Sequence, residues 1–123
     1  MSTLAGLDHV QVAAPARCEP RARRFYGELL GLRELEKPDA LAGRGGVWFA
    51  LGPAQLHVGV QEPFSPARKA HPALLARTDE LDGLAERLAG AGVEVKWDAA
   101  IEGVRRFFAE DPFGNRLEFV GGA

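Results

Sequence analysis

The three histidines of the chain are the residues whose types and spacing point most directly to chemistry. His9 and His57 are 48 residues apart, and His71 and Glu118 are 47 residues apart. A potential metal ligand therefore recurs at almost the same interval in each half of the chain. Three imidazoles and one carboxylate suit a borderline divalent metal such as Fe, Ni, Zn, Co or Mn. We take these four residues as candidate ligands of one divalent metal ion per chain.

The elements that must position these residues repeat as well. His9 precedes Gly31 by 22 residues, and His71 precedes Gly92 by 21 residues, although residue identity between the halves is slight. Hydrophobic periodicity, with glycine and proline as breaks, predicts the order β-α-β-β-β in each half. Helices are expected at about 20–30 and 79–90, and strands at about 4–14, 32–36, 46–51, 55–61, 71–77, 93–98, 104–110 and 115–120.

Alternation along the expected strands predicts which way the candidate ligands face. Leu56 and Val58 flank His57, and apolar residues flank Glu118 in the same way. Because successive strand residues point to opposite faces, the apolar neighbours would pack on the helices and the candidate ligands would point away from them. The four side chains would then converge on one concave surface.

Length, composition and charge limit the remaining possibilities. The chain has 123 residues, of which 46% are hydrophobic and 26% are charged, as expected of one globular domain. A net charge of −2 argues against a nucleic-acid or membrane-surface partner. Cys18 is the single cysteine, and no apolar run approaches the length of a membrane span. We expect a cytoplasmic protein.

Several motifs give the chain a family resemblance. It resembles the vicinal oxygen chelate superfamily, which includes glyoxalase I, methylmalonyl-CoA epimerase, extradiol dioxygenases, fosfomycin-resistance enzymes and bleomycin-binding proteins. The resemblance implies an α+β, glyoxalase-like fold in which two βαβββ modules pair into a half-open barrel. It implies a single domain, with module one at about residues 4–62 and module two at about 70–121. The matching segments are Leu7–Val12, Phe25–Leu32, Gln55–Val58, Ala70–Ala73 and Asp111–Phe119.

The resemblance also implies roles for individual residues. His9 matches the ligand of the first strand, His71 the ligand that opens the second module, and Glu118 the carboxylate ligand of the last strand. His57 falls where the fourth strand of the family supplies glutamate, glutamine, histidine or no ligand. The implied partners are a small-molecule substrate and a second copy of the chain, in a homodimer whose metal sites are often shared across the interface.

The family's shared chemistry implies an enzyme that chelates two vicinal substrate oxygens on a metal. A glyoxalase-like lyase or isomerase would use Glu118 and His57 in catalysis. Histidine in place of glutamate at position 57 departs from strict glutathione-dependent glyoxalases. The alternative is an extradiol-type dioxygenase, in which His9, His71 and Glu118 bind Fe(II) and His57 acts as an acid or base. Against it, the chain has two modules and a single tyrosine.

Two further alternatives concern antibiotics. A small-molecule binding or resistance protein without turnover would use an aromatic cavity, although alternate members of the aromatic pairs are expected in the core. These pairs are Trp48 with Phe49 and Phe107 with Phe108. A fosfomycin-modifying enzyme would need a cluster of cations. Arg105, Arg106 and Arg116 lie near Glu118 in sequence, and a solvated face is the expected location for them.

Overall fold

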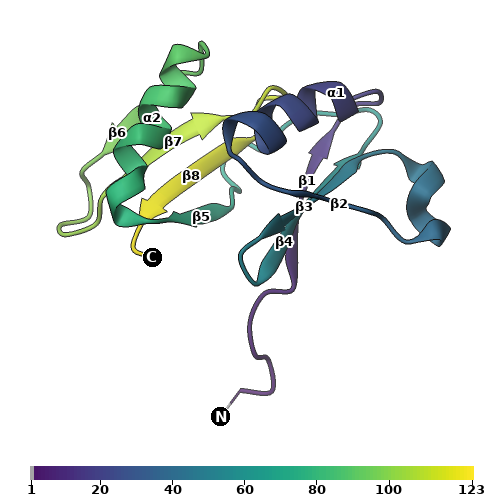
Figure 1. The fold of residues 1–123 in the computed structure, drawn as a ribbon, viewed down its shortest axis with the longest axis horizontal. Helices are drawn as coiled ribbons and strands as arrows, with labels where there is room; N and C mark the ends of the chain where they lie inside the picture. The colour runs from purple at the N-terminus through teal and green to yellow at the C-terminus, as the bar shows by residue number, and fades with distance from the viewer. Residues whose placement is uncertain (1) are drawn as a thin grey trace. The chain divides into compact units, whose positions relative to one another are not determined.

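The computed structural model describes residues 2–123, which divide into two compact units, residues 2–65 and Pro66–Ala123. Each unit contains one four-stranded sheet and a helical segment between its first two strands, as Figure 1 shows. The expected βαβββ module is therefore present twice, and the α+β, glyoxalase-like fold class is confirmed. That the two modules make up a single domain stays a prediction. No helix in residues 2–123 is long and apolar enough to cross a membrane.

The first unit forms a mixed sheet in the order β1-β4-β3-β2. Strand β1 runs parallel to β4, and the other neighbours are antiparallel. Its elements are β1 (His9–Ala14), α1 (Glu19–Ala22), a π-helical segment (Arg23–Leu29), β2 (Glu34–Leu35), a 3-10 helix (Asp39–Arg44), β3 (Val47–Leu51) and β4 (Ala54–Val60).

The second unit repeats this order as β5-β8-β7-β6, again with its first strand parallel to its last. In both modules the strand that opens the module therefore lies beside the strand that closes it. Its elements are β5 (Ala73–Ala76), a 3-10 helix (Thr78–Glu80), α2 (Leu81–Gly90), β6 (Lys96–Asp98), β7 (Arg106–Glu110) and β8 (Arg116–Gly121).

One face of each sheet packs on its own helical segment and forms a core. The alternation predicted from the sequence is confirmed in β4 and β8, where the core residues Leu56 and Val58 flank His57, and Leu117 and Phe119 flank Glu118. In the first unit the core includes Val12, Ala14, Phe25, Tyr26, Val47, Phe49, Leu56 and Val58. In the second unit it includes Leu74, Leu81, Ala85, Leu88, Phe107, Ala109, Leu117 and Phe119.

Several elements differ from the sequence-based expectation in where they begin or in their geometry. The first strand begins at His9 rather than near Leu4, and Leu4 and Leu7 are 84% and 82% exposed. Strand β5 begins at Ala73, so His71 lies just before it. The first helix changes from α to π geometry within its length, and the Leu30 amide donates to the Phe25 carbonyl at 2.9 Å. The wider turn is the i to i+5 pattern of a π-helix.

A compact turn precedes β8 and matches the turn expected over 111–114. Asp111 is buried, and its Oδ1 accepts hydrogen bonds from the amides of Phe113 and Asn115, both at 2.9 Å. Its Oδ2 accepts a third from the Asn115 side-chain amide at 2.8 Å. Gly114 has φ +91°, which glycine adopts without strain. The side chain of Asp111 thus fixes the path by which the chain enters β8.

The start of β3 is fixed by a close backbone approach. Gly46 has φ +87°, and a Cβ atom there would lie 2.1 Å from the Val58 carbonyl oxygen of β4. The Gly46 amide also donates to Glu19 Oε2 at 2.7 Å. This bond lowers the pKa of the Glu19 carboxyl below its usual value. A glycine at position 46 therefore sets the approach of β3 to β4, and β4 carries His57.

This approach predicts a large difference between two glycine substitutions. Gly46→Ala should destabilise the protein by at least about 3 kcal/mol, because it adds a steric clash to an unfavourable left-handed backbone. Gly52 is the matched control, with φ +53° and nothing within 4 Å of its added Cβ. Gly52→Ala should cost only about 1 to 2 kcal/mol. Urea unfolding followed by circular dichroism measures both, and equal losses would contradict the close approach.

Candidate functional site

In module one, His57 is the middle ring of a three-ring stack. Its ring centroid lies 4.3 Å from that of His9, with an interplanar angle of 18°. On its other side it lies 3.8 Å from Trp48, with an angle of 1°. Trp48 is opposite His57 in the β3–β4 register, so the sheet itself brings these rings together. His57 is only 4% exposed, whereas His9 is exposed.

The hydrogen bonds of His57 define the state of its imidazole. Nε2 lies 2.8 Å from Gln55 Oε1. An amide oxygen only accepts, so Nε2 carries the proton and the Nδ1 lone pair is left for a metal or a proton. Burial lowers the pKa of His57, and the neighbouring His9 lowers it further. His57 is therefore held in the neutral form, which both ligation and proton acceptance require.

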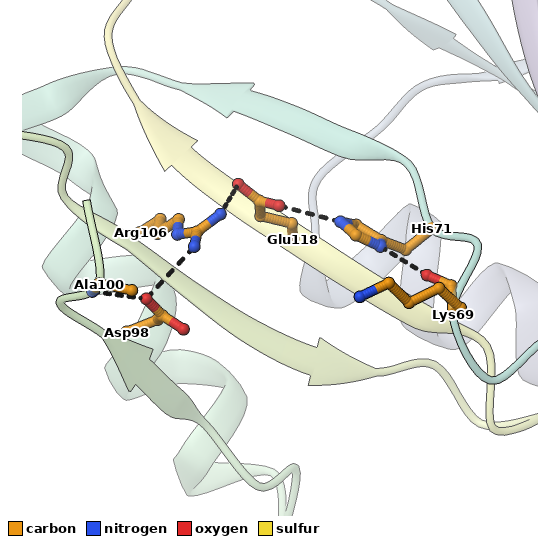
Figure 2. A network of polar contacts seen from close by, with 6 residues as sticks. All are labelled: Lys69, His71, Asp98, Ala100, Arg106 and Glu118. Carbon is orange, nitrogen blue, oxygen red and sulfur yellow. Dashed lines mark hydrogen bonds and ion pairs between the residues drawn. The ribbon is translucent and has the colours of Figure 1, made fainter.

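In module two, Glu118 is buried and both of its carboxylate oxygens are engaged. Oε1 lies 3.0 Å from His71 Nε2, and Oε2 accepts a hydrogen bond from Arg106 Nη1 at 3.1 Å. Arg106 also donates from Nη2 to Asp98 Oδ1 at 3.3 Å. Figure 2 shows this chain of contacts running from His71 through Glu118 and Arg106 to Asp98. A buried carboxylate is thus held between an imidazole and a guanidinium.

The charge of Glu118 follows from these contacts. Burial by itself raises the pKa of its carboxyl, but the hydrogen bonds from His71 and Arg106 together outweigh burial. The pKa of Glu118 consequently lies below its usual value, and the side chain is ionised at neutral pH. An ionised carboxylate is the form that binds a metal.

His9 and His71, the histidines at the start of each module, each have a hydrogen-bond partner at ring nitrogen Nδ1 as well. His71 Nδ1 lies 2.9 Å from the backbone carbonyl of Lys69, as Figure 2 shows. His9 Nδ1 lies 2.9 Å from Asp8 Oδ2. Carbonyl and carboxylate oxygens only accept, so Nδ1 carries the proton in both residues. Metal-binding histidines usually donate their second N–H to such a group, which leaves Nε2 for the metal.

Strand register places the pair His9 and His57 and the pair His71 and Glu118 in corresponding positions of the two modules. His71 lies two residues before Ala73, which is aligned with Glu118 in the β5–β8 ladder. His9 lies two residues before Gln11, which is aligned with His57 in the β1–β4 ladder. Each module therefore brings together one opening histidine and one residue of its closing strand.

The structure places the four candidate ligands in these two pairs, one pair in each unit. Over residues 2–123, three or more His, Cys, Asp or Glu side chains nowhere gather into a group that could hold a metal ion. Ligation of one ion by all four residues stays a prediction.

Sequence reasoning missed several neighbours of the candidate ligands. Gln55 lies two residues before His57, so the strand period would have placed it on the same face. The expectation of a solvated face is wrong for Arg106, whose side chain is 17% exposed and bridges two carboxylates. It holds for Arg105, which is 57% exposed and pairs with Asp82. In the sequence the two adjacent arginines differ only in that neighbouring residues of an extended chain point to opposite faces of the sheet.

The aromatic pairs divide between core and site as alternation requires. Phe49 and Phe107 are fully buried in the two cores. Trp48 is half-buried and stacks on His57, and Phe108 is half-buried with its ring centroid 5.5 Å from that of His71. One member of each pair therefore lies on the face that carries the candidate ligands.

Residues 6–119 match the model of the Glyoxalase/Bleomycin resistance protein/Dioxygenase superfamily, and the chain belongs to this superfamily. It is similar to a glyoxalase-family protein from Bacillus anthracis, with 46% identity, a TM-score of 0.94, and coverage of 100% of this chain and 99% of that one. No curated protein matches the chain.

Two more distant structures show the same fold. The fosfomycin resistance protein FosX from Listeria monocytogenes has 17% identity and a TM-score of 0.78, covering 98% of this chain and 96% of that one. Lactoylglutathione lyase from Agrobacterium tumefaciens has 18% identity and a TM-score of 0.76, with the same coverage of 98% and 96%. At this level of identity their similarity establishes the fold of this chain and does not establish its reaction.

The contrast between the adjacent arginines generates a stability prediction. Arg106→Gln should lower the melting temperature by about 5 °C or more, because Glu118 and Asp98 lose the cation that they share. Arg105→Gln is the matched control and should change it by no more than about 2 °C, since its ion pair is exposed. Calorimetry on the two variants measures both changes. Similar shifts would show that Arg106 does not stabilise the buried carboxylate.

Proposed function

We propose that this chain is a metal-dependent enzyme in which His9, His57, His71 and Glu118 hold one divalent metal ion. The contact between His71 and Glu118 is the observation that carries the proposal. Nδ1 of His71 donates to the Lys69 carbonyl, and Nε2 meets Glu118 Oε1 at 3.0 Å across a shared proton. A divalent ion in place of that proton would have both atoms as ligands.

The donor geometry of module two is compatible with a metal. Metal–ligand bonds are about 2.1 Å long, so two atoms that bind one ion lie no more than about 4.2 Å apart. His71 Nε2 and Glu118 Oε1, 3.0 Å apart, would satisfy this limit. His9 would contribute Nε2 and His57 would contribute Nδ1. When bound, the metal would act as a Lewis acid toward two vicinal oxygens of a small-molecule substrate.

The protein residues favour His57 as the proton acceptor. Both oxygens of Glu118 are engaged, whereas Nδ1 of the neutral His57 carries a lone pair. His57 has one free lone pair, so this role is the alternative to ligation. Outside the metal shell of a glyoxalase-like isomerase or lyase, His57 Nδ1 would take a proton from the C–H beside the chelated oxygens and return it to the adjacent carbon. The stacked rings of Trp48 and His9 and the bond to Gln55 would hold the imidazole in place.

The state of His57 is also compatible with a second candidate, an extradiol-type dioxygenase. A neutral imidazole with a free Nδ1 lone pair can act as an acid or base beside the metal shell instead of as a ligand. His9, His71 and Glu118 would then form the two-histidine, one-carboxylate set typical of non-haem Fe(II). Oxygen consumption with catechols would favour this reaction, and isomerisation of hemithioacetals without oxygen would favour the first.

Substitution of Glu118 tests the metal assignment. Glu118→Gln keeps the shape of the side chain but removes the charge that offsets the metal. The affinity for Zn(II) or Co(II) should fall by more than the roughly 10- to 100-fold cost of losing an outer partner. Isothermal titration of metal into protein purified without a histidine tag measures it. Glu110→Gln, an exposed glutamate on β7, is the control. Wild-type metal affinity in Glu118→Gln would refute the assignment.

His57→Ala in the same experiment separates its two roles. If His57 is a ligand, metal affinity and turnover fall together. If it is the base, metal stays bound and turnover drops by about 10² to 10⁴. The substrate panel consists of hemithioacetals, catechols and fosfomycin. Tight binding of a panel member without any product would contradict the enzyme and favour a binding or resistance protein.

We also propose that the chain forms a homodimer. Sedimentation velocity, which measures the oligomeric state, is the first test. Each open sheet leaves two edge strands, and twofold pairing is the commonest way in which identical chains cover such surfaces. If metal sites are shared, one chain supplies His9 and His57 and its partner supplies the other pair. Co-expression of a His9→Ala/His57→Ala chain with a His71→Ala/Glu118→Gln chain should then restore one site per heterodimer. A monomer would contradict the dimer, and a metal-free heterodimer would contradict sharing.

A further inference from the structure

The sheet face of module two that carries Glu118 also carries a second cation. Arg116 lies two residues before Glu118 on β8, so both side chains are on the same face. Phe108 of β7 is directly opposite Glu118 in the register. The guanidinium of Arg116 lies over the Phe108 ring, 4.3 Å from its centroid. This ring also meets His71 edge-on, with centroids 5.5 Å apart. One aromatic ring therefore links Arg116 to the proposed metal ligands.

Arg116 differs from Arg106 in its partners. Arg106 donates to both Glu118 and Asp98. Within residues 2–123 Arg116 makes no ion pair and no side-chain hydrogen bond, although its charge interacts with that of Asp98 at longer range. Glu110 is aligned with it across β7 but is exposed and forms no ion pair with it within residues 2–123. Stacking on Phe108 holds the guanidinium by its face and leaves its N–H donors for a ligand.

The distance along the strand suits a small anionic molecule. Two residues of a strand span about 6.8 Å, so a molecule held beside Glu118 reaches Arg116 across a few bonds. The charge balance favours an anion as well. Three neutral imidazoles and one carboxylate leave one positive charge of a divalent ion uncompensated, and the charge of Arg106 is already shared between two carboxylates. A planar guanidinium fork matches carboxylates and phosphonates.

We propose that Arg116 is a specificity-determining residue that binds an anionic group of the substrate, a carboxylate or a phosphonate, a few bonds from the two chelated oxygens. This inference rests on the proposed function for the identity of the ligand as substrate. The anion site itself is defined by Arg116 and Phe108 and can be measured without metal.

Titration of the metal-free 123-residue chain with malonate and phosphonoacetate tests the site. Binding is followed by the NMR signal of the Arg116 side-chain N–H and by calorimetry at low salt, with neutral malonamide as the control ligand. Both anions should shift this signal, and malonamide should not. Arg116→Gln should weaken anion binding by at least about tenfold, and Arg116→Lys should weaken it less. Arg105→Gln, an exposed arginine on the opposite face, should bind as the wild type does.

The outcomes separate the two proposals. Anion binding that is unchanged in Arg116→Gln, or an Arg116 signal that neither anion moves, would overturn the anion site. Zn(II) affinity of the same variant should remain within about threefold of the wild type, because Arg116 is not a ligand. If Zn(II) binds nowhere but anion binding still depends on Arg116, the metal enzyme fails and the anion site stands. The signal in the wild-type protein decides the matter even if a variant fails to fold.

Discussion

A buried carboxylate needs positive partners, and Glu118 has them on both of its oxygens. Arg106 donates to one oxygen from β7, and the other faces His71 at the entrance to β5. Both contacts exist only because β8 lies between these two strands, parallel to one and antiparallel to the other. Asp98 on β6 then balances the second half of the guanidinium. The arrangement of all four strands is thus tied to the charge of one side chain.

The first module has the same strand order but a different way of holding its pair. Aromatic stacking replaces charge, since His57 lies between Trp48 and His9 and its hydrogen bond goes to an uncharged amide. Burial of a neutral imidazole costs far less than burial of a carboxylate, so no cation is needed there. One backbone plan therefore supports a neutral site in one half and an ionic site in the other.

Alternation along the strands was enough to predict which face carries the candidate ligands, because Leu56, Val58 and their counterparts beside Glu118 are strongly apolar. It could not predict the partners of those ligands. Arg106 meets Glu118 across a strand boundary, and that contact depends on register, which the sequence of a single strand does not encode. The stack of Trp48 on His57 depends on register in the same way.

Element boundaries were less predictable for a related reason. Leu4 is apolar like a strand residue, yet it is exposed and lies outside β1, because the pattern records polarity and not burial. The change to π geometry after Ala22 was also invisible, since one wide turn keeps Phe25 and Tyr26 on the buried side of the helix. In both cases the polarity pattern does not record which residues are packed against the segment in three dimensions, and this packing decides where an element begins and which helical geometry it adopts.

The turn around Asp111 has a consequence for how such a chain can evolve. Its hydrogen bonds fix where β8 begins, and side chains along β8 alternate between the two faces of the sheet. Loss or gain of one residue in this turn would exchange the faces, turning Glu118 toward the helix and Leu117 into the polar network. Substitutions that preserve the turn are tolerable, but a change of its length by one is not. The number of residues in this turn is therefore a tighter structural constraint on the sheet than most of their identities.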